Sequence, residues 1–173
     1  FLTFADLKGA DLANADLQGA DLSYADLQGA NLSYADLRNA DLNDANLSNT
    51  KLVGTNFAMA CLKGVDFRNA DLSKANLRSD TPYKKYSHNN HQYNFIDLKN
   101  ADLSGANLKG TLYDAHTRFP LELDLEAIGA YLIAPGVSLE KADLSYTDLS
   151  GANLAGANLS QSDLTGVNLN QTN

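Results

Sequence analysis

Two groups of side chains in this sequence could do chemistry: histidines, lysines and tyrosines gathered between residues 80 and 95, and aspartates that recur along the rest of the chain. His88 and His91 have a spacing compatible with metal binding. A zinc site normally takes three or four ligands, however, and neither a cysteine nor a convincing pair of carboxylates accompanies these histidines. Cys61 is the only cysteine, so an intramolecular disulfide is impossible. We therefore expect no metal and no cofactor.

Catalysis has little support in the residue pattern. The aspartates are dispersed evenly, and no acid is paired with a neighbour that would tune its pKa for acid or base chemistry. The chain has no glycine-rich phosphate loop and no zinc motif of the known spacings. We expect a protein that is not an enzyme.

The segment 80–95 instead suits contact with another protein. It is rich in basic and aromatic residues on a chain that is otherwise acidic, and conspicuous loops on a regular scaffold often carry binding. The simpler alternative is a polar loop whose tyrosines lie on the wall of the scaffold. The candidate interaction residues are Tyr83, Lys84, Lys85, Tyr86, His88, His91 and Tyr93.

The charge of the chain limits its partners. Its formal net charge is −8, which disfavours direct binding to nucleic acid or to an anionic membrane surface. No apolar run has the roughly eighteen residues that a membrane span needs. The chain begins with Phe1 and not with methionine, so a cleaved leader stays open. The compartment is undetermined, with the cytoplasm slightly favoured.

A five-residue repeat organises the chain outside two interruptions. From Leu2 to Leu77 every fifth residue is leucine or phenylalanine, sixteen positions in a row. Alanine usually stands two positions earlier, and aspartate or asparagine lies between them. Glycine, asparagine or tyrosine is common two positions after the leucine. Such a regular repeat determines the architecture of the whole chain.

A period of five fits neither a helix nor a flat strand. On an α-helix, steps of five residues carry the leucines round all sides, and on a strand they alternate between the two faces. The chain must therefore turn every five residues, with alanine and leucine inside, the acid or amide outside, and glycine or asparagine at the corners. Successive coils then stack at the strand spacing of about 4.8 Å, which gives an all-β solenoid.

The run ADLSYADLQGANLSYADLRNADL resembles the pentapeptide-repeat family, of a type common in photosynthetic bacteria. This resemblance implies a right-handed quadrilateral β-helix with four pentapeptides in each coil. We expect residues 1–173 to form a single domain of this kind.

Two insertions are expected to leave the solenoid, at about 80–95 and 116–136, because the repeat resumes after each of them. In the second insertion, Asp124 can cap a short helix from Leu125 to roughly Ile133. Leu125, Ile128 and Leu132 would share one face of this helix and pack on the outside of the solenoid.

With both insertions removed and the four units per coil that the resemblance implies, a row of acids is expected along one face, interrupted by Asn46. The row consists of Asp6, Asp26, Asp66, Asp102, Asp143 and Asp163. Stacked like charges repel one another, so such a row serves either solubility or a function. Lysines and arginines beside the row, and a net charge well below that of DNA phosphates, favour a solvated wall.

We therefore expect a non-enzymatic structural or protein-interaction module with an unknown protein partner. The resemblance supplies an alternative, since some pentapeptide-repeat proteins mimic duplex DNA and inhibit type II topoisomerases. Neither end of the chain shows obvious covering residues, and an exposed coil end can join another chain. The sequence therefore predicts either an end-to-end homodimer or additional capping residues.

Overall fold

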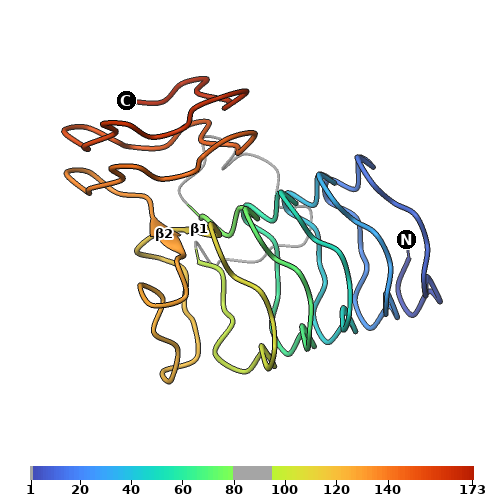
Figure 1. Cartoon of the computed structure of the whole chain (residues 1–173). Coiled ribbons are helices and arrows are strands. Elements are labelled where there is room, and N and C mark those ends of the chain that lie inside the picture. Colours follow the sequence, from blue (N-terminus) through green and yellow to red (C-terminus); the bar gives the residue numbers. More distant parts are fainter. Residues whose placement is uncertain (1, 80–94) are drawn as a thin grey trace.

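The computed structural model describes residues 2–79 and 95–173, most of which wind into stacked coils (Figure 1). Parallel bridges join residues that lie twenty apart in the sequence, such as Asp6 with Asp26 and Asp11 with Asn31. Twenty residues are four pentapeptides, so each coil has four sides of five residues. This geometry confirms that the chain turns every five residues, and it agrees with the four units per coil that the resemblance implies.

Each pentapeptide ends in a tight turn that its own sequence favours. In the unit that ends at Gly9, the N–H of Ala10 donates to the carbonyl of Leu7 at 3.0 Å and closes the turn. Gly9 has a φ of +64°, a left-handed conformation that glycine adopts without strain and asparagine adopts more readily than most residues. Between coils, the N–H of Leu7 donates to the carbonyl of Asp26 at 2.8 Å. Backbone hydrogen bonds therefore hold the chain together both within and between coils.

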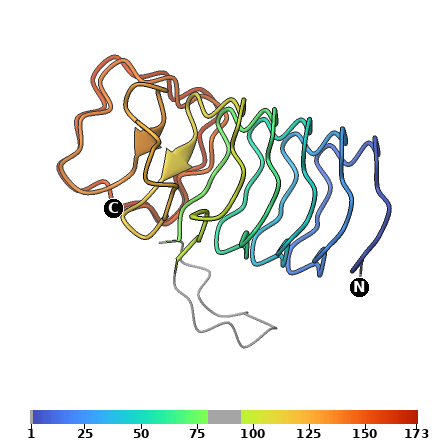
Figure 2. The ribbon, with the colours of Figure 1, turned by 90° about the horizontal axis from the view of Figure 1, so that it is seen from below.

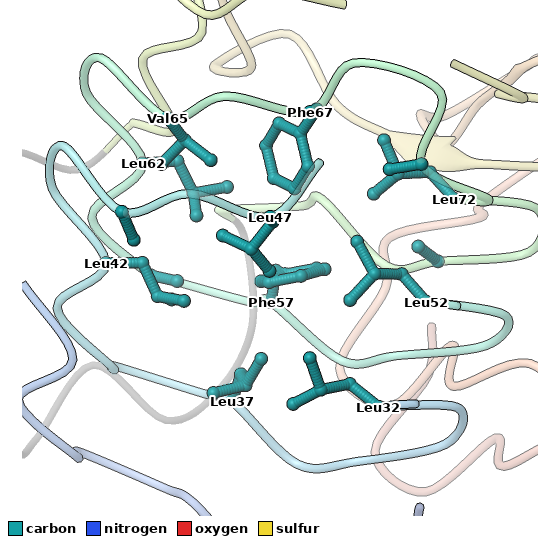
Figure 3. Close-up of a cluster of buried hydrophobic side chains, with 14 of the residues drawn as sticks. Leu32, Leu37, Leu42, Leu47, Leu52, Phe57, Leu62, Val65, Phe67 and Leu72 are labelled. Atoms are coloured by element: carbon teal, nitrogen blue, oxygen red, sulfur yellow. The ribbon is translucent and has the colours of Figure 1, made fainter. Parts of the chain in front are cut away.

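Leucines and alanines fill the interior of the coils, as predicted. The leucines at the repeat positions between 22 and 77 are at most 1% exposed. Phe57 and Phe67, which replace leucine, meet edge to face with their ring centroids 6.1 Å apart (Figure 3). Thr55 replaces an inward alanine, and its hydroxyl donates to the carbonyl of Leu32 at 2.7 Å. A buried hydroxyl is tolerated here because it has this partner.

The coil that follows residue 79 spans more of the sequence than the coils before it. Bridges join Asp66 to Asp102 and Asp71 to Asn107, each pair 36 residues apart, which is sixteen more than one coil. The repeats on both sides therefore keep the register that removal of sixteen residues predicts. Residues 80–94, which make up nearly all of the first predicted insertion, lie outside the described part of the chain.

The second interruption begins and ends with short strands. β1 (Leu112–Tyr113) pairs in parallel with β2 (Tyr131–Leu132), and Leu112 lies opposite Tyr131. Between these two strands, the chain runs alongside the segment that follows residue 95, and Arg118 forms a parallel bridge with Asp97.

The helix predicted from Leu125 to Ile133 does not form. Asp124 does cap a turn, because its carboxylate accepts the N–H of Ala127 at 3.0 Å. The turn ends at Gly129, whose φ of +76° is left-handed and cannot continue a right-handed helix. β2 follows two residues later.

The apolar face expected on that helix is also wrong. Leu125 is only partly covered, and Ile128 and Leu132 are 36% and 37% exposed. Ile133 is buried instead, with 1% of its surface exposed, and it lies in a second hydrophobic core together with Leu112.

Residues 137–173 form a second stack of coils around this second core. Bridges twenty residues apart join Asp143 to Asp163 and Asp148 to Asn168. The coils of this second stack, orange to red in Figure 1, lie beside the first stack and are piled in a different direction, as Figure 2 also shows. The repeats therefore do not all continue along one axis.

Leu112 gives the physical reason for this change of direction. It occupies an outward ladder position, bridged to Asn76, where the preceding coils carry aspartate or asparagine. Its side chain is nevertheless 0% exposed, because it packs in the core of the second stack. Covering an apolar side chain at an outward position removes it from water and so stabilises the fold.

Candidate interaction surfaces

The aspartate or asparagine of each unit folds back onto the turn that follows it. The Asp26 carboxylate accepts the N–H of Gln28 at 3.2 Å, and the Asp102 carboxylate accepts the N–H of Ser104 at 3.0 Å. Aspartate and asparagine stabilise turns in this way because their side chains reach the N–H two residues on. Glutamate and glutamine, which have a longer side chain, are absent from this position of the repeats. The outward acids therefore have a structural role as turn caps, which the sequence analysis missed.

Asparagine amides relieve the repulsion between stacked aspartates. The Asn46 amide donates to the carboxylate of Asp26 in the preceding coil at 3.1 Å, and the Asn107 amide donates to Asp71 at 2.9 Å. Each of these contacts replaces a repulsive pair of carboxylates with a hydrogen bond.

Basic side chains compensate the aspartates that stack directly on other aspartates. Lys8 Nζ lies 2.9 Å from the carboxylate of Asp26, and its hydrogen bond lowers the pKa of Asp26. The Arg68 guanidinium lies 2.6 Å from Asp66 and 3.8 Å from Asp102, and its hydrogen bond holds the pKa of Asp66 below the usual value. The acidic wall is therefore less negative than its aspartates alone suggest.

The six aspartates of the predicted acidic row fall into two groups. One ladder of the first stack holds Asp6, Asp26, Asp66 and Asp102, with Asn46 between them. Asp143 and Asp163 bridge each other in the second stack, where Asp143 lies 2.8 Å from Lys74. A single continuous row is therefore wrong, because the second stack leaves the axis of the first.

Buried hydrogen bonds fix the two ends of the predicted interaction loop. The N–H of Ser79 donates to the carboxylate of Asp114, and the N–H of Ile96 donates to the Ser79 hydroxyl at 3.0 Å. All three residues are at most 3% exposed. The chain therefore leaves and re-enters the coil at neighbouring points. The candidate loop residues themselves lie outside the described residues: Tyr83, Lys84, Lys85, Tyr86, His88, His91 and Tyr93.

Polar side chains connect the two stacks, and the sequence did not reveal them. Arg78 is 0% exposed although it occupies the same position of its unit as the exposed Arg68. Its guanidinium donates to the Asn76 side chain at 3.2 Å and to the carbonyl of Ser150 in the second stack at 2.9 Å. The Lys74 ammonium lies 2.8 Å from Asp143, and its hydrogen bond is the largest of the effects that lower the pKa of Asp143 to about 2. The one sequence signal of this junction is the apolar residue at the outward position of β1.

A groove of about 370 Å³ lies between the stacks, and we call it the inter-stack groove. Equivalent corners of the two stacks supply most of its lining. The matching sets are Tyr34, Asp36, Gly54 and Asn56 from the first stack, and Tyr146, Asp148, Gly166 and Asn168 from the second. The two tyrosines are 49% and 63% exposed, and the Asn56 amide donates to the carboxylate of Asp148 at 2.7 Å. The sequence carries a signal of this match, a Tyr-x-Asp triplet followed twenty residues later by Gly-x-Asn, which occurs in both stacks.

The other reactive groups of the described residues are Cys61 and the side chains of the types that bind metals. Burial, with a smaller effect of Asp41, raises the pKa of the Cys61 thiol to about 11, so this thiol stays protonated near neutral pH. Within residues 2–79 and 95–173, no three histidine, cysteine, aspartate or glutamate side chains gather closely enough to hold a metal ion. Those same ranges contain no helix with the length and apolar character that crossing a bilayer requires.

Comparisons with solved structures identify similar proteins. The chain is 32% identical to a pentapeptide-repeat protein from Nostoc, over 73% of this chain and 84% of that chain, with a TM-score of 0.46. It is 31% identical to the pentapeptide-repeat protein Rfr23 from the cyanobacterium Cyanothece, over 66% of this chain and 63% of that chain, with a TM-score of 0.43. It is 21% identical to QnrB1, a plasmid-mediated fluoroquinolone resistance protein, over 99% of this chain and 84% of that chain, with a TM-score of 0.46.

The sequence itself also matches a family profile. No curated protein gives a significant match to the chain. The profile described as pentapeptide repeats matches residues 2–39, 30–69, 60–79 and 136–171, with eight copies in all. These matches extend over more than half of the chain, and the coils they predict are the four-sided coils observed. The chain, with its four-sided coils, therefore belongs to the pentapeptide-repeat family.

Proposed function

We propose that this protein is a non-enzymatic protein-interaction module and that the segment 80–95 contacts its partner. The observation that carries the proposal is the buried frame in which Ser79, Ile96 and Asp114 hold the two ends of this segment together. Fixed ends reduce the number of conformations that the segment must lose on binding, which favours affinity. Its tyrosines are of the type that often dominates binding energy at protein interfaces.

Replacement of residues 80–95 by two glycines tests this proposal. The short linker can close the coil, because the Ile96 N–H already lies 3.0 Å from the Ser79 hydroxyl. Partners of the intact and shortened proteins are captured from the native cell extract and compared by quantitative mass spectrometry. We expect at least one partner of the intact protein to be lost, while the midpoint of thermal unfolding changes little.

A pair of double variants supplies the matched control. Lys84→Ala with Lys85→Ala is expected to weaken capture of the same partner. Lys51→Ala with Lys63→Ala removes two exposed lysines from the wall of the first stack and is expected to leave it unchanged. Identical partner sets for the intact and shortened proteins would contradict the proposal.

Mimicry of duplex DNA is the alternative, and the charge pattern supports it less. Asparagine amides and the side chains of Lys8 and Arg68 compensate the aspartates of the longest acidic ladder. DNA instead presents an uninterrupted phosphate charge about every 1.7 Å along its axis. We expect no inhibition of a type II topoisomerase in a supercoiling assay at micromolar protein. Inhibition that Asp26→Asn and Asp66→Asn abolish would establish the mimic instead.

End-to-end dimerisation stays a prediction. Light scattering at rising protein concentration measures it directly. A dimer mass at high concentration is the expected result. A monomer mass at every concentration, for a chain without additional capping residues, would contradict it.

A further inference from the structure

We propose that the inter-stack groove binds a basic side chain, an arginine or a lysine, of a partner protein. In this assignment the cation lies against the rings of Tyr34 and Tyr146 and faces the carboxylate of Asp148. The inference rests on the proposed interaction role, because it names a second contact through which such a partner is held.

Asp148 supplies the fixed negative charge. One of its carboxylate oxygens accepts the N–H of Ser150 at 2.9 Å and the amide of Asn168 at 3.0 Å, and the other accepts the amide of Asn56 at 2.7 Å. All three donors are uncharged, so they orient the carboxylate without cancelling its charge. In the part of the chain that the structure describes, no lysine or arginine lies within ion-pair distance of it.

Asp36, whose carboxylate also lines the groove, is already paired with a cationic side chain. The Arg38 guanidinium forms an ion pair with Asp36, and its Nε lies 2.8 Å from one carboxylate oxygen and 2.9 Å from the other. This pair is internally neutral. The groove therefore carries one net negative charge, on a chain whose formal net charge is −8. The negative charge of the groove and the negative charge of the whole chain both attract a cation.

The two tyrosine rings are held in place by the glycines one coil further on. Tyr34 and Tyr146 occupy left-handed corner positions, with φ of 61° and 57°. A Cβ atom added at Gly54 would lie 2.6 Å from the Tyr34 ring, and one added at Gly166 would lie 2.7 Å from the Tyr146 ring. Each ring thus packs directly against the glycine, where the Cβ atom of any other residue would collide with it. An aromatic face attracts a lysine or arginine within about 6 Å of its centroid.

Titration with short peptides tests the proposal. The probes are N-acetyl-Gly-Arg-Gly-amide, the corresponding lysine peptide, and the peptide with citrulline, which keeps the shape of arginine without its charge. Binding to the full chain is followed by nuclear magnetic resonance, through the backbone amide shifts of residues around 34–38 and 146–148. We expect the arginine and lysine peptides to shift these amides, and the citrulline peptide to bind at least about threefold more weakly.

Variants locate the binding site. Tyr146→Asn and Asp148→Asn are expected to weaken arginine-peptide binding by about threefold or more, since each removes one attraction for the cation. Asparagine suits the left-handed corner, where the chain itself uses it at Asn14. Tyr24→Asn and Asp163→Asn make the same changes at exposed positions outside the groove and are expected to have no effect.

Three results would overturn the assignment: no shift at millimolar arginine peptide, equal binding of the citrulline peptide, or equal weakening by the control variants. Thermal unfolding of every variant excludes loss of the fold as the cause. The result is separable from the loop experiment. If the shortened protein loses its partner but the arginine peptide does not bind, only the groove assignment fails. If the peptide binds but no partner depends on residues 80–95, the loop proposal fails alone.

Discussion

Replacement of Leu112 by asparagine would test whether the second stack covers the side of the first. Leu112 is 0% exposed although its ladder position is outward. Burial of a leucine side chain stabilises a fold by about 1.5–3 kcal/mol, and an amide left without a partner in an apolar contact costs about 1–3 kcal/mol more. We therefore expect the free energy of unfolding to fall by about 3–5 kcal/mol, or the second stack to detach.

Urea unfolding followed by circular dichroism measures the stability of the Leu112→Asn variant, and small-angle X-ray scattering measures whether the chain expands. Leu164→Asn is the matched control in the second stack, where the leucine is 37% exposed, and its cost is expected to be about 1 kcal/mol. If position 112 were an ordinary outward position, an asparagine there would extend the amide ladder in which Asn76 donates to Asn56 at 3.1 Å. Unchanged stability and unchanged dimensions would refute the reasoning.

Two further predictions concern the groove and the junction. Gly54→Ala is expected to cost about 2 kcal/mol, because it adds a contact 2.6 Å from the Tyr34 ring to left-handed strain of about 1 kcal/mol. Gly29→Ala, with nothing within 4 Å, is expected to cost only the strain, and equal losses in urea unfolding would argue against the ring contact. The pKa of Asp143 is lowered from 3.8 to about 2, chiefly by Lys74. The ionised Asp143 therefore stabilises the fold above pH 3.8, and this stabilisation is lost as the pH falls towards 2. Because Asp143 is largely exposed, we expect Asp143→Asn to cost less than about 1 kcal/mol at neutral pH and nothing near pH 2; a cost that does not change with pH would contradict this.

The sequence predicts the coils well because their geometry is local. Each turn depends on five neighbouring residues, and the inward leucines recur at a fixed interval, so periodicity alone places Leu22 or Leu72 in the core. The turn-capping role of Asp26 is equally local. It was missed because an outward position suggests a solvated charge, although aspartate is a common turn residue.

The arrangement of the two stacks could not be derived in the same way. It depends on Leu112, a single apolar residue at a polar position, and on contacts between residues far apart in sequence, such as Arg78 with the carbonyl of Ser150. Nothing in the repeat distinguishes Arg78 from an exposed corner residue such as Arg68. The failure of the predicted helix depends on Gly129, which weakens a helix and adopts a left-handed conformation here.

The inter-stack groove escaped the sequence analysis for the same reason. Its two tyrosines stand 112 positions apart, and the residue pattern that their corners share does not by itself place them side by side. Only the packing of one stack against the other brings Tyr34 and Tyr146 to one groove.

The most direct test of this account is a cross-link between the stacks. In a Cys61→Ser background, Asn56→Cys and Asp148→Cys place two thiols where the native side chains meet at 2.7 Å. A short bifunctional thiol reagent is expected to join them within one chain, as peptide mass mapping would show. The control pairs Asp148→Cys with Asn46→Cys, on the opposite side of the same four-sided coil, and is expected not to react. No cross-link between positions 56 and 148, or equal cross-linking of both pairs, would contradict the side-by-side stacks on which the groove depends.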